Sequence, residues 1–265
     1  GNINQGENAI AIGFGAGYTN QGSNSVAISL NTGFSNQGSN SVAIGYSAAQ
    51  NNQGNYSVAV GNNAGISNQR SYAIAIGHQS GSKDQSGNAI AIGSSDVNNS
   101  AAGKSNQREY AIAIGTAAGN SNQQPYAVAI GFTAGGETQG SNAIAIGFQA
   151  GYKDQSGNAV AIGFNSGYNS QEEGSVAIGT NAGSTSQKKF AVAIGQDAGI
   201  SNQGSESVAI GINAGTTSQE EGSVAIGTNA GNSNQGLYAV AIGPSAGQTS
   251  QKELAVAIGT GAGNS

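Results

Sequence analysis

The sequence predicts an all-β fold, a parallel β-solenoid that forms a single repeat domain over residues 1–265. The first observation is a sixteen-residue repeat that opens with Asn-Ala-Ile-Ala-Ile-Gly at residue 8 and recurs in register. The second is Val or Ile at two alternate positions of every repeat, the pattern of a β-strand. The third is Gly, which supplies 45 of the 265 residues and returns at fixed turn positions. One such coil cannot bury its own apolar face, so the coils must stack on one another.

Sixteen repeats follow one another, and we number the positions within each of them from 1 to 16. They start at residues 8, 24, 40, 56, 72, 88, 110, 126, 142, 158, 174, 190, 206, 222, 238 and 254. The repeat that starts at Asn88 is longer than the others, and its extra residues fall within 94–101. Insertions on solenoids often mark a binding face, although this one is equally compatible with a neutral outer loop.

The main strand of each coil is expected at positions 2 to 6. Positions 3 and 5 are always Val or Ile, position 4 is always Ala, and position 6 is Gly in every repeat except at Ser29. Because side chains alternate across a strand, we expect positions 3 and 5 to face the core and positions 2 and 4 to face the other way.

The invariant Ala at position 4 predicts an interface. A solvated strand face tolerates Lys, Thr or Glu, whereas this position never varies. We therefore expect the Ala face to pack against identical chains in a homo-oligomer. The alternative is a second layer of the same chain that covers this face. The predicted oligomer-face residues are Ala11, Ala27, Ala43, Ala59, Ala75, Ala91, Ala113, Ala129, Ala145, Ala161, Ala177, Ala193, Ala209, Ala225, Ala241 and Ala257.

Position 14 is Gln in every complete repeat. Amide side chains stacked at the strand spacing of about 4.8 Å can hydrogen-bond along the axis, as they do in cross-β structures. We therefore expect a structural ladder in which each Gln bonds to the coils above and below. Its members are Gln21, Gln37, Gln53, Gln69, Gln85, Gln107, Gln123, Gln139, Gln155, Gln171, Gln187, Gln203, Gln219, Gln235 and Gln251.

Other side chains should meet in the same register. The pair Glu172-Glu173 occupies positions 15 and 16 of one repeat, and Lys188-Lys189 occupies them in the next, so ion pairs are expected. Aromatic residues at positions 1, 7 and 11 should stack, for instance Tyr152 with Tyr168 and Phe148 with Phe164. Such stacks either seal the edge of a thin core or form a sticky, carbohydrate-binding stripe.

Composition excludes several classes of function. The chain has no Cys and one His, His78 at an outer position, which disfavours disulfide, zinc and histidine chemistry. A net charge of −5 with 8 Lys and Arg disfavours nucleic acid as a partner. No apolar run reaches the roughly 18 residues of a membrane span, so no membrane insertion is expected in this segment. No carboxylate pair recurs between repeats. We therefore expect no enzyme, no catalytic residue, no cofactor and no metal site.

A resemblance becomes visible in the segments Ser-Val-Ala-Ile-Gly at 41–45, 175–179, 207–211 and 223–227. This motif resembles the head repeat of YadA-type trimeric autotransporter adhesins, and similar repeats occur in phage and viral fibre proteins. The resemblance implies a left-handed β-roll, a homotrimer and attachment to host or matrix molecules. This repeat is slightly longer than the common family repeat, and the Gln at position 14 is not a usual family hallmark. A weaker resemblance links residues 37–42 to curlin-type functional amyloid.

The predicted function is that of a non-enzymatic, extracellular structural or adhesive rod on a cell or virion surface, acting by rigid repetitive display. Its partners would be copies of itself, in a trimer, and a surface receptor or matrix molecule. One alternative is a self-assembling filament or functional-amyloid-like subunit. Another is an ice-binding solenoid, which positions 12 and 13 disfavour because they mix Ser, Thr, Asn, Lys and Asp. The assembly state distinguishes a closed trimer from an open filament.

Overall fold

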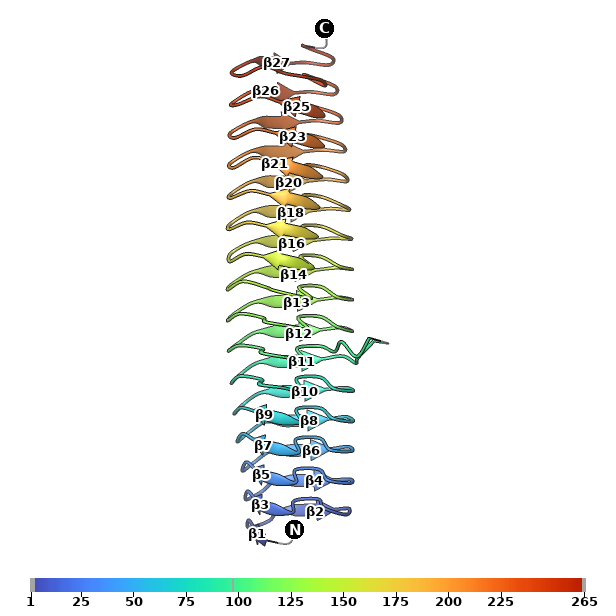
Figure 1. Ribbon diagram of the computed structural model, residues 1–265, viewed down its shortest axis with the longest axis vertical. Coiled ribbons are helices and arrows are strands. Elements are labelled where there is room, and N and C mark those ends of the chain that lie inside the picture. The colour runs from blue at the N-terminus through green and yellow to red at the C-terminus, as the bar shows by residue number, and fades with distance from the viewer. Residues whose placement is uncertain (1–2, 97, 264–265) are drawn as a thin grey trace. The chain divides into compact units, whose positions relative to one another are not determined.

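The computed structural model describes residues 3–96 and 98–263 (Figure 1). Residues 1–2 and 264–265 of the predicted domain, and Val97 of the predicted insertion, lie outside the described residues. The chain divides into two compact units, Gly1–Glu137 and Thr138–Ser265, here called the N-terminal unit and the C-terminal unit. That they form one repeat domain stays a prediction.

In the N-terminal unit each of the eight described coils contributes a strand at positions 3 to 5, four of them contribute a second strand at positions 12 to 14, and one further strand of this second kind precedes the first coil. The first set is β2 (Ile10–Ile12), β4 (Val26–Ile28), β6 (Val42–Ile44), β8 (Val58–Val60), β10 (Ile74–Ile76), β11 (Ile90–Ile92), β12 (Ile112–Ile114) and β13 (Val128–Ile130). The second is β1 (Ile3–Gln5), β3 (Thr19–Gln21), β5 (Ser35–Gln37), β7 (Asn51–Gln53) and β9 (Ser67–Gln69). Neighbouring coils pair in parallel, and β11 pairs with β12 as Ile90 with Ile112, so the register survives the insertion.

The C-terminal unit repeats this arrangement. Its first set is β14 (Ile144–Ile146), β16 (Val160–Ile162), β18 (Val176–Ile178), β20 (Val192–Ile194), β22 (Val208–Ile210), β24 (Val224–Ile226), β26 (Val240–Ile242) and β27 (Val256–Ile258). Its second is β15 (Lys153–Gln155), β17 (Asn169–Gln171), β19 (Thr185–Gln187), β21 (Ser201–Gln203), β23 (Thr217–Gln219) and β25 (Ser233–Gln235). The paired strands described in this unit are parallel and identical positions face each other, as in Val176 with Val192. The predicted all-β parallel β-solenoid is confirmed, with no helix over the part of the chain that the structure describes.

The turns depend on residues that accept positive φ. Position 6 favours Gly, with Ser29 at φ 124° as the exception, because its φ is about +120 to +130° in most coils and a Cβ there lies close to the next coil. At Gly163, with φ +130°, an added Cβ would lie 2.6 Å from the carbonyl oxygen of Gly179. Positions 1, 8 and 13 also adopt the left-handed region, most often with Asn, such as Asn24 at φ 55°. Asn is among the residues that tolerate this region best.

The interior is lined by the small residues of positions 2, 4 and 9, so the predicted orientation of the main strand is wrong. Ala177 at position 4 and Ala182 at position 9 are both fully buried within one chain. The Val and Ile side chains at positions 3 and 5 point outward and stay half-buried or exposed. The reason is the width of the coil: a Cβ added to Gly183 would lie 3.2 Å from the Ala177 methyl and 2.7 Å from Gln187 Oε1. Small residues, almost always Ala, Ser or Gly with one Thr at Thr32, and the flat Gln amide fit between the two walls.

The predicted oligomer face is therefore part of the core. The residues corrected in this way are Ala11, Ala27, Ala43, Ala59, Ala75, Ala91, Ala113, Ala129, Ala145, Ala161, Ala177, Ala193, Ala209, Ala225, Ala241 and Ala257, all of them buried except Ala11, which is half-buried in the first coil. The structure instead matches the alternative stated above: a second layer of the same chain covers the Ala face.

Candidate functional site

The outward face of the main strands is the most extensive candidate site in each unit. Every strand presents two aliphatic side chains to the outside, and parallel pairing aligns them with the next coil. Ile44 is 38% exposed and Ile226 is 37% exposed, although β-branched side chains usually lie in protein interiors. A contiguous apolar surface of this kind marks an interaction site. We call it the aliphatic face, formed by the Val and Ile residues at positions 3 and 5.

The Gln residues of position 14 lie in the interior, behind the aliphatic face. In the C-terminal unit, Gln187 Nε2 donates to the carbonyl oxygens of Val176 at 2.8 Å and Ala191 at 3.0 Å, and to Gln203 Oε1 at 3.1 Å. One amide therefore ties the first strand of its own coil to the next coil and to the next amide. Gln69 makes the same three contacts in the N-terminal unit, at 2.8, 3.2 and 3.1 Å.

The first coils depart from this pattern. The Oε1 atoms of Gln21, Gln37 and Gln53 are buried without a hydrogen-bond partner among the described residues. Their Nε2 atoms still donate to strand carbonyls, as Gln21 does to Ile10 at 2.8 Å. Amide-to-amide bonds begin with Gln53 and Gln69, at 3.3 Å. The ladder thus consists of two kinds of bond, and Gln21 and Gln37 make only the bond to the strand carbonyl.

The family comparison now decides what kind of repeat this is. A family model described as YadA head domain repeat (2 copies) matches residues 37–64, 170–198 and 203–230. These three segments are YadA-type head repeats. The matched residues include all four Ser-Val-Ala-Ile-Gly segments, and they fall in both units. Searches of curated proteins and of solved structures found no match.

Stacking of the coils brings together charged and aromatic side chains as the register predicts. Lys188 Nζ lies 2.9 Å from Glu172 Oε1, and Lys189 Nζ lies 3.7 Å from Glu173 Oε2, which confirms the expected ion pairs. The stacks of Tyr152 on Tyr168 and of Phe148 on Phe164 are also confirmed, with ring centroids 5.3 and 5.1 Å apart. These contacts lie on the outer turns and leave the interior to Ala and Gln.

The insertion projects from the coil of β11 (Figure 1). Asp96 Oδ1 accepts hydrogen bonds from the backbone N–H groups of Asn98 and Ser100, both at 2.9 Å, which closes the loop on itself. His78 Nδ1 lies 2.7 Å from Ser95 Oγ, so the single histidine is used in a contact with the loop. Within the described residues, no group of three or more His, Cys, Asp or Glu is placed to hold a metal ion. Among the same residues, no helix is long and apolar enough to cross a membrane.

Proposed function

We propose that this chain is a non-enzymatic, extracellular structural and adhesive rod on a cell or virion surface, whose YadA-type repeats assemble into a homotrimer. The observation that carries the proposal is the aliphatic face. The interior of each coil is already filled by Ala and Gln, so the Val and Ile side chains have no place to bury except against another chain. A second copy presents the same ladder at the same spacing, which makes it a matched partner.

The energetics favour association over a solvated aliphatic face. Burying a Val or Ile side chain completely is worth about 1.5–3 kcal/mol, and these side chains are still partly exposed in the single chain. Even about 1 kcal/mol for each of them, repeated in eight coils of the C-terminal unit, exceeds the cost of association, which is of order 4–15 kcal/mol. A single-chain solenoid with a core of Ala, Gly and Gln has little other apolar area to bury. Assembly therefore supplies the hydrophobic burial that the coils lack by themselves.

The test is the molar mass in solution, by light scattering coupled to size exclusion. One chain has a mass of 25.8 kDa, so a trimer is expected at three times that value, about 77 kDa. A triple variant with Ile178→Lys, Ile194→Lys and Ile226→Lys puts charges on the aliphatic face and should lose the trimer. The control carries Thr180→Lys, Gln196→Lys and Thr228→Lys on exposed turn positions of the same three coils, and it should remain trimeric.

Other outcomes count against the proposal. A monomer of 25.8 kDa at micromolar concentration would show that the aliphatic face is not an interface. A mass that grows with protein concentration would favour the filament alternative. Equal dissociation of the two triple variants would place the interface on the turns.

A further inference from the structure

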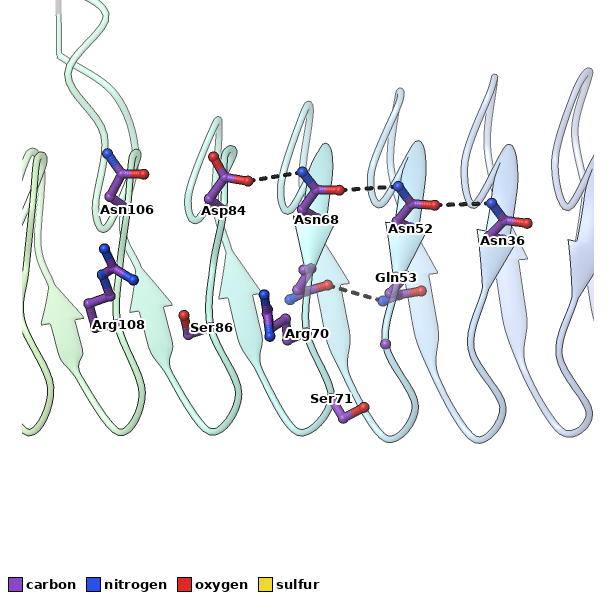
Figure 2. Close-up of a pocket in the computed structure, with 12 residues that line it drawn as sticks. Asn36, Asn52, Gln53, Asn68, Arg70, Ser71, Asp84, Ser86, Asn106 and Arg108 are labelled. Carbon is purple, nitrogen blue, oxygen red and sulfur yellow. Dashed lines mark hydrogen bonds between the residues drawn. The ribbon is translucent and has the colours of Figure 1, made fainter.

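A polar groove of about 850 Å³ runs across five coils of the N-terminal unit (Figure 2). Figure 2 shows two rows of side chains along it, one from position 13 and one from position 15. Asn, Gln, Gly, Ser, Asp and Arg line it, and no described apolar side chain does. A groove of this composition is suited to a hydroxyl-rich ligand and not to the side chains of an apolar peptide.

The first row is a ladder of amides. Asn36 Nδ2 donates to Asn52 Oδ1 at 3.0 Å, Asn52 donates to Asn68 at 3.1 Å, and Asn68 donates to Asp84 Oδ1 at 2.9 Å. Each inner amide uses one N–H and one oxygen lone pair in the ladder, and keeps one of each for a ligand. Donor and acceptor pairs therefore repeat along the groove at the coil spacing of about 4.8 Å. A linear chain of hydroxyl groups that runs along the solenoid axis, across successive coils, can be bonded by this row.

The second row carries positive charge. Arg70 and Arg108 occupy position 15 two coils apart, roughly 9.6 Å along the axis, with Ser86 between them. Both side chains are exposed, and neither guanidinium group makes a hydrogen bond or ion pair with any residue that the structure describes. A guanidinium group binds carboxylate or sulfate through two parallel N–H groups. In a chain with only 8 Lys and Arg, two unpaired guanidinium groups in one groove point to an anionic ligand.

We propose that this groove binds a linear acidic polysaccharide. Sugar hydroxyls bond to the amides of Asn36, Asn52 and Asn68, and carboxylates or sulfates of alternate sugars bond to Arg70 and Arg108. Asp84 lies in the amide row and repels anionic groups there, which directs them to the arginine row. The inference deepens the adhesive part of the proposed function, on which it rests, by naming the class of molecule that is bound.

The test uses the full chain and calorimetric titration with four probes. Hyaluronan oligosaccharides carry only carboxylates, heparin oligosaccharides also carry sulfates, cello-oligosaccharides are neutral, and poly-glutamate is an acidic peptide. Binding to hyaluronan, heparin or both is expected, and the preferred probe identifies the anionic group. The double variant Arg70→Gln and Arg108→Gln should weaken that binding about tenfold or more, because two charge-assisted contacts are lost.

The matched control is Glu220→Gln, which changes an exposed residue of a smaller groove in the C-terminal unit and should leave the affinity unchanged. Equal binding of cello-oligosaccharides or poly-glutamate, no binding of either acidic glycan, or unchanged affinity in the double arginine variant would each overturn the proposal. Light scattering separates the two proposals. A trimer that binds no acidic glycan would contradict only the assignment of the groove. A monomer that binds the glycan would contradict only the proposed trimer.

Discussion

The grooves of the two units occupy the same positions of the coil and differ in charge. The N-terminal groove measures about 850 Å³ and carries Arg70 and Arg108, whereas the C-terminal groove measures about 260 Å³ and carries Glu220. Beneath both lies the same pair of ladder amides, Gln53 to Gln69 at 3.3 Å and Gln219 to Gln235 at 2.8 Å. The backbone and the interior are thus shared, and only the outer side chains of positions 13 and 15 distinguish the two surfaces.

This difference shows how one coil serves two purposes. Positions 2, 4, 6, 9, 10 and 14 determine whether a coil can close and stack, because they are buried or sit in turns that a side chain would block. Positions 13 and 15 affect only what the surface offers to a ligand. The repeat can therefore change its recognition properties from one region to another without a change of fold.

The largest expected effect comes from the part that the two grooves share. Gln69→Leu and Gln219→Leu should each lower the free energy of unfolding by about 3 kcal/mol, since each leaves buried strand carbonyls and a neighbouring amide without a partner. Urea denaturation at fixed protein concentration measures the change. Because the interiors are equivalent, the two values should agree within about 1 kcal/mol.

Ser67→Ala and Thr217→Ala are the controls, on the second strand of the same coils, and should change stability by less than about 0.5 kcal/mol. A Gln69 variant as stable as the parent chain would show that the ladder has no structural role. A large inequality between the two Gln variants would show that the two interiors differ.

The sequence predicted the repeat, the strands, the stacking and the ion pairs, because each of these follows from periodicity. It did not predict which face of the strand points inward. Alternation places positions 3 and 5 opposite position 4, but it is symmetric with respect to inside and outside. The hydrophobicity of Val and Ile favoured them for the core, but the coil is too narrow to hold their side chains inside. The decisive signal was present in the sequence: Ala177 and its equivalents never vary in size, as expected where two walls approach closely.

The groove escaped the sequence analysis for a related reason. Its residues come from five different repeats, most of them at positions that vary between repeats, so no single repeat indicates a site. Asn is the commonest residue at position 13. Its frequency reflects φ near +55°, as at Asn52 with φ 58°, and the same backbone conformation aligns the amides into a row. The cause of the Asn preference is conformational, and the amide surface is its consequence.

A second comparison concerns position 1, where the units support an aromatic ring in different ways. Tyr72 stacks on Tyr56 in the N-terminal unit, with centroids 5.2 Å apart, whereas Tyr238 lies over Gly222 in the C-terminal unit. Tyr72→Leu and Tyr238→Leu should each cost about 1 kcal/mol of stability, since both lose ring contacts of similar area. Leu254 already occupies position 1 at φ 58°, so the backbone accepts the change. Thermal denaturation of the two variants tests this prediction. A loss of stability in the Tyr72 variant alone would show that only ring-on-ring contact contributes.

The charge difference between the grooves can be reversed by one substitution. Lys188 and Lys252 occupy position 15 two coils before and two coils after Glu220, so Glu220→Arg would complete a row of cations with the spacing of Arg70 and Arg108. Made in the Arg70→Gln and Arg108→Gln background, this change should raise the affinity for the acidic glycan about threefold. Full recovery is not expected, because Ser218 interrupts the amide row there. Calorimetric titration measures the gain, and no gain at all would show that charge at position 15 is insufficient.

The smallest effect is expected where cations of the C-terminal unit are already paired. The side chains of Lys188 and Glu172 are 53% and 37% exposed, and those of Lys189 and Glu173 are 57% and 51% exposed. Ion pairs this exposed contribute little, so Glu172→Gln with Glu173→Gln should lower the free energy of unfolding by less than about 0.5 kcal/mol for each pair. The loss should vanish in about 1 M salt, where the screening length is about 3 Å.

Arg70→Gln provides the comparison, since that guanidinium has no described partner and its removal should leave stability unchanged at any salt concentration. A salt-dependent loss in the Arg70 variant would reveal a pairing of that side chain and would weaken its assignment to ligand binding. A salt-dependent loss of stability in the glutamate variant alone would strengthen the difference between the two units. The lysines of the C-terminal unit would then be engaged in holding neighbouring coils together, while the arginines of the N-terminal unit remain available to an anion.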